Sequence, residues 1–289
     1  MKNIYISVLL LCFVLTQNAV SQSINESFGA ASAAMGNTAV HNQSIYSVFG
    51  NQAGLANVTQ IGAAVQLENR FLIPELQSGS ILFALPTKSG TFGVGANYYG
   101  FDTYNQQQFA LSYGRKLFEE KLSIGASFNY LLFNFADFGN TGKTTFGIGL
   151  QYFINSNIRI AAHVFNPIRI QIADNPFADD YVETAFKLGL AFEPSEQVGV
   201  YLEAKKTVHY PAEFRGGIEY FPVPLLVLRA GFATVPSAQN DGRFGGELAL
   251  ASFGAGVHFE QLKIDLASRF HPQLGHTPTV SLAWLMKDK

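Results

Sequence analysis

From Gln60 onward, hydrophobic and polar side chains alternate in a series of short segments. The segment 122–133 shows the pattern clearly. Its apolar face carries Leu122, Ile124, Ala126, Phe128, Tyr130 and Leu132, and its other face carries Ser123, Gly125, Ser127 and Asn129. Because successive side chains of a β-strand point to opposite faces, each segment predicts a strand with one apolar face and one small or polar face.

Turn residues separate these segments and divide the chain into about fourteen predicted strands of about nine to twelve residues. The predicted strands start near Ile61, Ser78, Thr91, Gln107, Lys121, Thr144, Ile158, Val182, Gln197, Ala212, Leu225, Ala251, Leu262 and Thr277. A tilted strand of this length crosses a bilayer, whereas strands of soluble sandwiches are usually about five or six residues long. The lengths therefore favour a membrane barrel.

The connections between strands support the same interpretation. Short links such as 87–90, 155–157 and 194–196 follow even-numbered strands, whereas longer links at 136–143, 167–181 and 235–250 follow odd-numbered strands. Outer-membrane barrels have short periplasmic turns and longer extracellular loops. We therefore predict an all-β fold, a transmembrane antiparallel β-barrel of about 14 strands formed by residues 60–289 in the bacterial outer membrane.

Composition changes the picture only by excluding other classes. Of the 289 residues, 14% are charged and 48% are hydrophobic, and about 25% charged residues are usual in soluble domains. A soluble protein would need more charge to cover its surface. The net charge of -2 argues against a nucleic-acid partner, because there is no basic excess to meet phosphates.

The first residues read as a targeting segment. Lys2 precedes an apolar stretch from Ile4 to Leu15, and small residues at Ala19 and Ser21 fit a signal-peptidase site. We expect residues 1–21 to be a signal peptide. The single cysteine, Cys12, lies within it, so the predicted mature chain has no thiol for a disulfide or a metal site.

Residues 22–59 precede the first strand and show neither a helical nor a strand period. The stretch 36–58 is rich in Gly, Asn and Ala and has no charge apart from what His41 carries. A barrel of about fourteen strands is too wide for its own side chains to fill. We therefore expect residues 22–59 to enter the barrel from the periplasmic end as a plug, or hatch.

The two halves of the barrel differ on the inward face. In the first half the inward residues are small or neutral, such as Gly93, Gly125 and Gly149. In the second half the predicted lumen charges are Lys187, Glu203, Lys205, Arg215, Glu219, Arg229, Glu260, Asp265 and Arg269, with Arg159 beside them. Two interpretations stay open, either a solvated pore wall or charges that pair with one another or with an inserted segment.

Part of the N-terminal region resembles a known family. Ala34-Met35-Gly36 and the later run from Asn51 to Ala56 are similar to the N-terminal signature of fatty-acid-transporter-like barrels, both the FadL type and the PorV/PorQ family. In that signature a proline usually stands where this chain has Gln52. The resemblance assigns a plug motif to Met35, Gly36, Asn51, Gln52, Ala53, Gly54 and Leu55.

The resemblance implies two functions. A PorV/PorQ-type protein is an interaction or shuttle component of type IX protein secretion or surface attachment, with other envelope proteins and exported cargo as partners. The alternative is a FadL-like gated transporter of hydrophobic molecules such as long-chain fatty acids. Short outer loops and an ionic second half favour the first interpretation. Outer-membrane lipid is a partner in both.

Catalysis is not expected from this sequence. The six histidines are scattered, and no nucleophile-elbow motif is present. Neither cysteines nor regularly spaced carboxylates complete a metal site. We therefore expect no enzyme activity, no cofactor and no bound metal.

Overall fold

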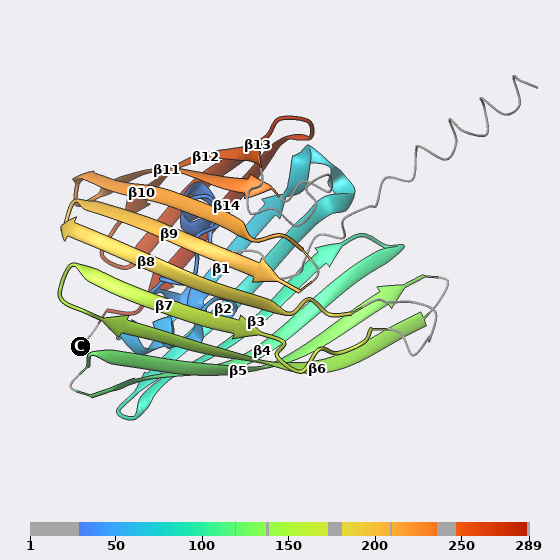
Figure 1. Ribbon diagram of the computed structural model, residues 1–289, viewed down its shortest axis with the longest axis horizontal. Helices are drawn as coiled ribbons and strands as arrows, with labels where there is room; N and C mark the ends of the chain where they lie inside the picture. The colour runs from blue at the N-terminus through green and yellow to red at the C-terminus, as the bar shows by residue number, and fades with distance from the viewer. Residues whose placement is uncertain are drawn as a thin grey trace, which may run out of the picture.

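A computed structural model describes residues 29–118, 120–136, 139–172, 181–208, 210–235 and 247–287. The predicted signal peptide, residues 1–21, lies outside these ranges. Fourteen antiparallel strands form one closed barrel in which each strand pairs with its neighbours in sequence (Figure 1). Strand β1 pairs with β14 from Gly62↔Leu285 to Glu68↔Thr279, which closes the sheet. The predicted fold, strand number and direction are confirmed.

The strand boundaries are as follows. The strands are β1 (Gly62–Asn69), β2 (Gln77–Thr87), β3 (Gly90–Gly100), β4 (Tyr104–Leu117), β5 (Leu122–Phe135), β6 (Gly139–Phe153), β7 (Ile158–Phe165), β8 (Ala185–Ser195), β9 (Val198–Thr207), β10 (Glu213–Val223), β11 (Leu226–Val235), β12 (Glu247–His258), β13 (Leu262–His271) and β14 (Gly275–Leu285). Two short 3-10 helices, η3 (Arg70–Leu72) and η4 (Pro74–Leu76), lie between β1 and β2.

One predicted connection is wrong. The stretch 136–143 was expected to be a loop, but β6 begins at Gly139 and pairs with β5 up to Phe135↔Gly139. Backbone pairing continues here because it does not depend on apolar side chains. The polar residues that suggested a loop, such as Asn140 and Thr141, extend the β5–β6 hairpin instead.

The two rims of the barrel differ in their connections. The longest links, 70–76, 166–184 and 236–246, all follow odd-numbered strands. The opposite rim carries the short turns, the start of β1 and the C-terminal end of β14, where the Met286 N–H donates to the Ile61 carbonyl at 2.7 Å (Figure 1). By the pattern of known barrels, the short-turn rim is periplasmic and the other rim is extracellular.

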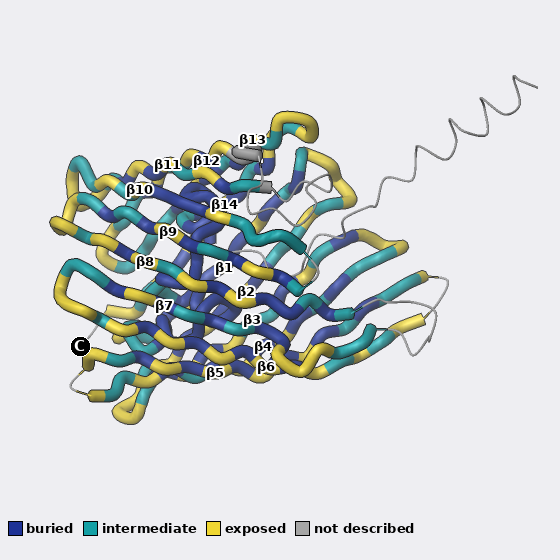
Figure 2. The backbone as a smooth tube through the Cα atoms, in the orientation of Figure 1, coloured by how far each residue is buried: buried dark blue, intermediate teal, exposed yellow. Residues whose placement is uncertain are grey.

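Burial alternates along the strands with the apolar face outward (Figure 2). On β5, Ile124 and Phe128 are exposed, whereas Ser127 and Asn129 are buried. Large apolar side chains are exposed in this way on all the strands whose side chains are fully described. Because lipid removes the penalty for such exposure and closure leaves no unpaired strand edge, this arrangement suits a bilayer.

Replacing Phe128 with Arg tests the lipid-facing register. Phe128 lies near the middle of β5, where its ring contacts that of Phe146 at a centroid distance of 5.7 Å. A charge there should lower the free energy of unfolding by about 2–4 kcal/mol or block assembly. Urea unfolding in lipid vesicles measures the change. The matched control, Ile154→Arg in the β6–β7 turn, should cost much less, and equal tolerance at both sites would contradict the outward assignment of Phe128.

Candidate functional site

Residues 29–58 lie inside the barrel and are called here the inner segment (Figure 1). It contains one short helix, α2 (Ala30–Ala34), and two 3-10 helices, η1 (Ile45–Val48) and η2 (Gln52–Asn57). Side chains of Ser44 and Asn51 cap the two 3-10 helices by accepting hydrogen bonds from the Tyr46 and Ala53 N–H groups. The segment thus has only short helices, two of them with side-chain caps, and it lies along the inside of the barrel wall.

The inner segment makes close approaches to most of the barrel wall. It begins between β1 and β14, where the Gly29 N–H donates to Gln66 and the Ala30 N–H donates to Ser281. Helix α2 then contacts β11 to β14, and η2 contacts β3 to β6. The Val58 carbonyl accepts a hydrogen bond from Thr91 at 3.0 Å, just before the chain enters β1. The segment therefore makes a circuit of the lumen.

Glycines on the inward face make room for this circuit. An added Cβ at Gly149 would lie 1.9 Å from Asn51 Oδ1, and one at Gly125 would lie 2.3 Å from the Gln52 carbonyl carbon. Similar contacts below 3.0 Å with the inner segment occur at Gly93, Gly95, Gly114, Gly189, Gly217, Gly231 and Gly254. The small inward residues predicted from the sequence are thus the surface against which the segment packs.

Charged side chains hold the middle of the inner segment through its backbone. Glu203 Oε2 accepts hydrogen bonds from the Ala39 and Val40 N–H groups at 2.7 and 2.9 Å. Arg215 donates to the Asn37 carbonyl at 3.1 Å, and Arg159 donates to the His41 carbonyl at 3.3 Å. Backbone groups that no secondary structure pairs are therefore satisfied by charges from β7, β9 and β10.

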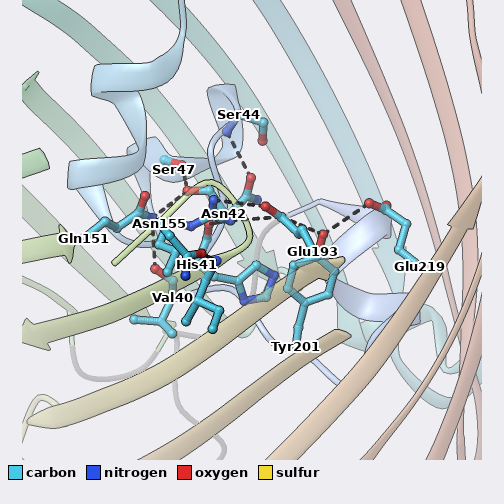
Figure 3. Close-up of polar contacts among 12 residues, drawn as sticks. Val40, His41, Asn42, Ser44, Ser47, Gln151, Asn155, Glu193, Tyr201 and Glu219 are labelled. Carbon is cyan, nitrogen blue, oxygen red and sulfur yellow. Dashed lines mark hydrogen bonds and ion pairs between the residues drawn. The ribbon is translucent and has the colours of Figure 1, made fainter. Parts of the chain in front are cut away.

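His41 is buried within this group. Its ring stacks on the ring of Tyr201 at a centroid distance of 4.1 Å, as Figure 3 shows. Burial, together with the Arg159 guanidinium, lowers the pKa of His41 to about 3. A neutral His41 does not oppose Arg159. The Tyr201 hydroxyl in turn donates to Glu193 and Glu219, which connects the segment to a wider network (Figure 3).

Neutral groups hold the second part of the segment. Asn51 Nδ2 donates to the carbonyls of Val40, Leu150 and Ala162 at 2.7, 3.2 and 3.3 Å. This one amide group therefore contacts another part of the inner segment as well as β6 and β7. Gln151 adds donations to the Val40 and Asn42 carbonyls (Figure 3). An apolar cluster that includes Ile45, Val48, Phe49, Leu55 and Leu82 fills the remaining space beside β2 to β4.

The plug-motif residues all lie in the inner segment and are buried, from Met35 and Gly36 to Asn51, Gln52, Ala53, Gly54 and Leu55. Gly36 requires its residue type, since its φ is 70° and an added Cβ would lie 2.1 Å from the Phe232 carbonyl oxygen. At Gly54 an added Cβ would lie 1.9 Å from the Asn42 carbonyl oxygen. Residues 22–28 of the predicted plug lie outside the described ranges.

The lumen charges mostly pair with one another. Lys205 lies 3.0 Å from Glu183 and 3.7 Å from Glu213, and Arg269 lies 2.8 Å from Glu68. A second group joins Arg229 to Glu219 at 2.5 Å and to Asp265 at 2.6 Å. Lys187 is buried on the inward face of β8. Lys205, Arg229 and Arg269 are thus paired with carboxylates of the same inward face.

Glu260 is a correction. The sequence placed it among the lumen charges, but it lies in the turn between β12 and β13, where its side chain is 81% exposed and pairs with Lys287 at 2.9 Å. Strand β12 ends at His258, so the alternation that assigned Glu260 an inward position no longer applies. The inward partners Glu68, Glu183, Glu193 and Glu213 were not identified as site residues from the sequence.

An apolar cluster on the inward face was also missed. Leu131, Phe133, Phe165 and Val182 are buried together near the extracellular ends of β5 and β7, with Phe135, Ile170 and Ile172 packed against them. Leu131 and Phe133 share the register of Ser127 and Asn129, so they face the lumen. The consecutive apolar residues from Tyr130 to Phe133 broke the alternation and were the available signal. We call these seven residues the inward apolar cluster.

None of the helices among the described residues is long and apolar enough to cross a membrane. Within the same ranges, no group of three or more His, Cys, Asp or Glu side chains is arranged to hold a metal ion.

The closed barrel with its apolar outer face defines a transmembrane β-barrel of the bacterial outer membrane. No protein-family model and no curated protein matches the chain. Solved structures do match it over nearly their whole length. The chain is similar to the CymD monoaromatic hydrocarbon channel, with a TM-score of 0.66 and 14% identity over 92% of this chain and 100% of that chain.

Two further solved structures have the same fold. The Ralstonia pickettii toluene transporter TbuX matches with a TM-score of 0.65 and 13% identity over 91% of this chain and 100% of that chain. A Pseudomonas aeruginosa FadL homologue matches with a TM-score of 0.63 and 13% identity over 90% and 98%. The chain therefore shares the fold of FadL-like outer-membrane channels. No sequence match supports the PorV/PorQ family specifically.

Replacing Gly125 with Val tests the fit between wall and segment. The new Cβ would lie 2.3 and 2.4 Å from backbone atoms of Gln52 and Ala53, which cannot move without displacing η2. The barrel should still assemble, because the backbone of Gly125 keeps its pairing with β4 and β6. Ion conductance in planar bilayers should rise, because η2 is displaced. In the control Gly79→Ala, the new Cβ lies 3.3 Å from the Leu67 side chain and 3.8 Å from the Gln66 carbonyl oxygen, and meets no atom of the inner segment within 4 Å. Equal conductance in both variants would argue against tight packing of η2.

Replacing Glu203 with Ala tests the charged attachment. Loss of the carboxylate leaves the Ala39 and Val40 N–H groups without their acceptor and removes one of the two carboxylates that pair with Arg215, which keeps Glu213. Breaking a buried ion pair in this way costs about 3–5 kcal/mol. Amide hydrogen exchange at residues 39–40 should become faster. Glu203→Gln keeps one acceptor oxygen and should give an intermediate rate. Unchanged protection in the Ala variant would show that Glu203 does not hold the segment.

Proposed function

We propose that this protein is an outer-membrane channel that takes up small hydrophobic molecules and that the inner segment closes it at rest. The observation that carries the proposal is the inward apolar cluster. A polar pore wall has no need of buried Leu and Phe side chains at its mouth, whereas an apolar solute leaving water gains about 25 cal/mol per Å² of surface buried there.

The position of the cluster suits uptake from outside. It lies at the extracellular ends of β5 and β7 and includes Val182 of the 166–184 link. The inner segment lies below it, attached to the wall by charged and neutral groups. A solute held at the cluster would therefore pass inward only when the segment shifts, so the closed arrangement described here corresponds to a resting state.

The comparisons favour this transport hypothesis over the secretion hypothesis. The similar solved structures include a monoaromatic hydrocarbon channel and toluene transporters. The ionic second half of the lumen had favoured a PorV/PorQ-type role, but those charges pair with one another and with the inner segment. They are thus accounted for without a protein partner. We infer that the solute belongs to the class of small apolar molecules, with monoaromatic compounds as the first to test.

Uptake of labelled toluene by intact Gram-negative cells that make the protein tests this function. Expression should raise the uptake rate, because the lipopolysaccharide leaflet slows free diffusion. Phe133→Asn should reduce the added rate about tenfold, since an unpaired amide against an apolar solute costs about 1–3 kcal/mol. Phe128→Leu on the lipid-facing side of the same strand is the control. If expression does not raise uptake, the transport proposal is wrong.

Deleting residues 36–58 tests the closing role. The shortened protein should assemble and conduct ions in planar bilayers at a level well above that of the full chain, because the segment no longer occupies the lumen.

Capture of stable envelope-protein partners by the full chain, with no toluene uptake, would instead support the secretion hypothesis.

A further inference from the structure

Three polar atoms converge beside Gly147 on the inward face of β6. The position that a Cβ would occupy at Gly147 lies 2.7 Å from Ser127 Oγ, 3.2 Å from Gln52 Oε1 and 3.3 Å from His163 Nε2. These atoms come from β5, the inner segment and β7. Because Gly147 has no side chain, nothing from β6 separates them.

Two of these groups are buried without a hydrogen-bond partner. Within the part of the chain that the structure describes, neither ring nitrogen of His163 is paired, and Gln52 Oε1 is unpaired as well. Gln52 donates its Nε2 to the Gly50 and Val48 carbonyls, and its Oε1 lies beside Gly147 of β6. His163 is 6% exposed and Gln52 is 1% exposed. Unpaired buried polar groups of this kind cost free energy unless something binds them.

The inward apolar cluster lies next to these groups. Phe165 follows His163 by two residues on the same face of β7, and on β5 Leu131 lies on the same face as Ser127, four residues further on. Two residues along a strand correspond to about 6.8 Å. That is close to the length of a benzene ring with one substituent atom, so one small molecule would reach from the cluster to His163 and Gln52.

The side chains near His163 already include several paired carboxylates. Lys187 is the β8 neighbour of His163, and Lys205 is the β9 neighbour of Lys187. Around them, Lys205 and Arg215 pair with three carboxylates, Glu183, Glu203 and Glu213, and Lys187 is buried on the same inward face. An added carboxylate would leave one buried charge uncompensated, which is costly in this setting.

We propose that the solute of this channel carries one uncharged hydroxyl group on an apolar body, as a phenol does, and that His163 and Gln52 bind that hydroxyl. The inference rests on the proposed transport function and narrows its substrate class. A hydroxyl group can donate one hydrogen bond and accept another. It would donate to Gln52 Oε1, which only accepts, and accept from the ring N–H of His163. A plain hydrocarbon leaves both unpaired.

Binding of three matched probes tests the proposal. Toluene, 4-methylphenol and 4-methylbenzoate share one methyl-substituted ring and differ in carrying no polar group, a hydroxyl or a carboxylate. Near pH 7 the phenol is neutral and the carboxylic acid is ionised. Equilibrium dialysis of the purified full chain in detergent should show 4-methylphenol bound about tenfold more tightly than toluene, and 4-methylbenzoate bound more weakly than 4-methylphenol.

Variants at His163 assign the preference to the site. His163→Phe keeps an aromatic ring without nitrogens and should bring the ratio of 4-methylphenol to toluene affinity close to one. His163→Gln replaces the ring nitrogen with an amide of similar reach and should restore part of the preference. Ser123→Ala, which removes another unpaired inward hydroxyl near the periplasmic end of β5, should leave the ratio unchanged. These ratios compare probes within one variant, so a change in folded fraction does not alter them.

The outcomes separate this inference from the transport proposal. Equal affinity for toluene and 4-methylphenol would overturn the hydroxyl site, with water satisfying His163 and Gln52, and would leave hydrocarbon transport standing. Tightest binding of 4-methylbenzoate would also overturn it and assign the site to an anion beside Lys187. If no probe binds and cells gain no toluene uptake, both proposals fail.

Discussion

Everything in this structure depends on the pairing of β1 with β14. Until those strands meet, the sheet has two edges with unpaired backbone groups, which lipid cannot satisfy. Closure fixes a lumen, and the alternation of each strand then decides what faces lipid and what faces inward. Phe128 faces outward and Asn129 inward for this reason alone. Small and polar side chains, which lipid does not favour on the outer face, therefore face the lumen.

The inner segment resolves the problem that this interior creates. Residues 29–58 carry few side chains able to fill a wide space. They lie against inward glycines of the barrel wall, and their backbone groups form hydrogen bonds with wall side chains. Charges pair the backbone at residues 37–41, whereas neutral amides and apolar side chains hold residues 45–55. The polar wall is therefore mostly occupied in holding the segment and in pairing with itself. What remains for a solute is the inward apolar cluster and the few unpaired groups beneath it.

The sequence was sufficient for the barrel, because period-two alternation and turn spacing are local signals that lipid enforces in every strand. It was less sufficient for β6, where polar residues at 140–143 suggested a loop although pairing with β5 continues. Glu260 was misplaced because alternation was extended past the end of β12. The contacts of Asn51 with Leu150 and Ala162 join residues far apart in the chain, and no local pattern encodes them. Leu131 and Phe133 were not identified from the sequence, because the apolar run from Tyr130 to Phe133 hides which of its side chains face inward.

The circuit of the inner segment also bears on how the barrel is assembled. Its first described residues, Gly29 and Ala30, donate hydrogen bonds to Gln66 of β1 and Ser281 of β14, two strands at opposite ends of the chain. Bringing such distant strands together is the slowest and entropically most expensive step in forming a cylinder. A segment that holds both partners shortens that search. The residues that occupy the lumen of the finished barrel would thus also act as a template for the pairing of β1 with β14.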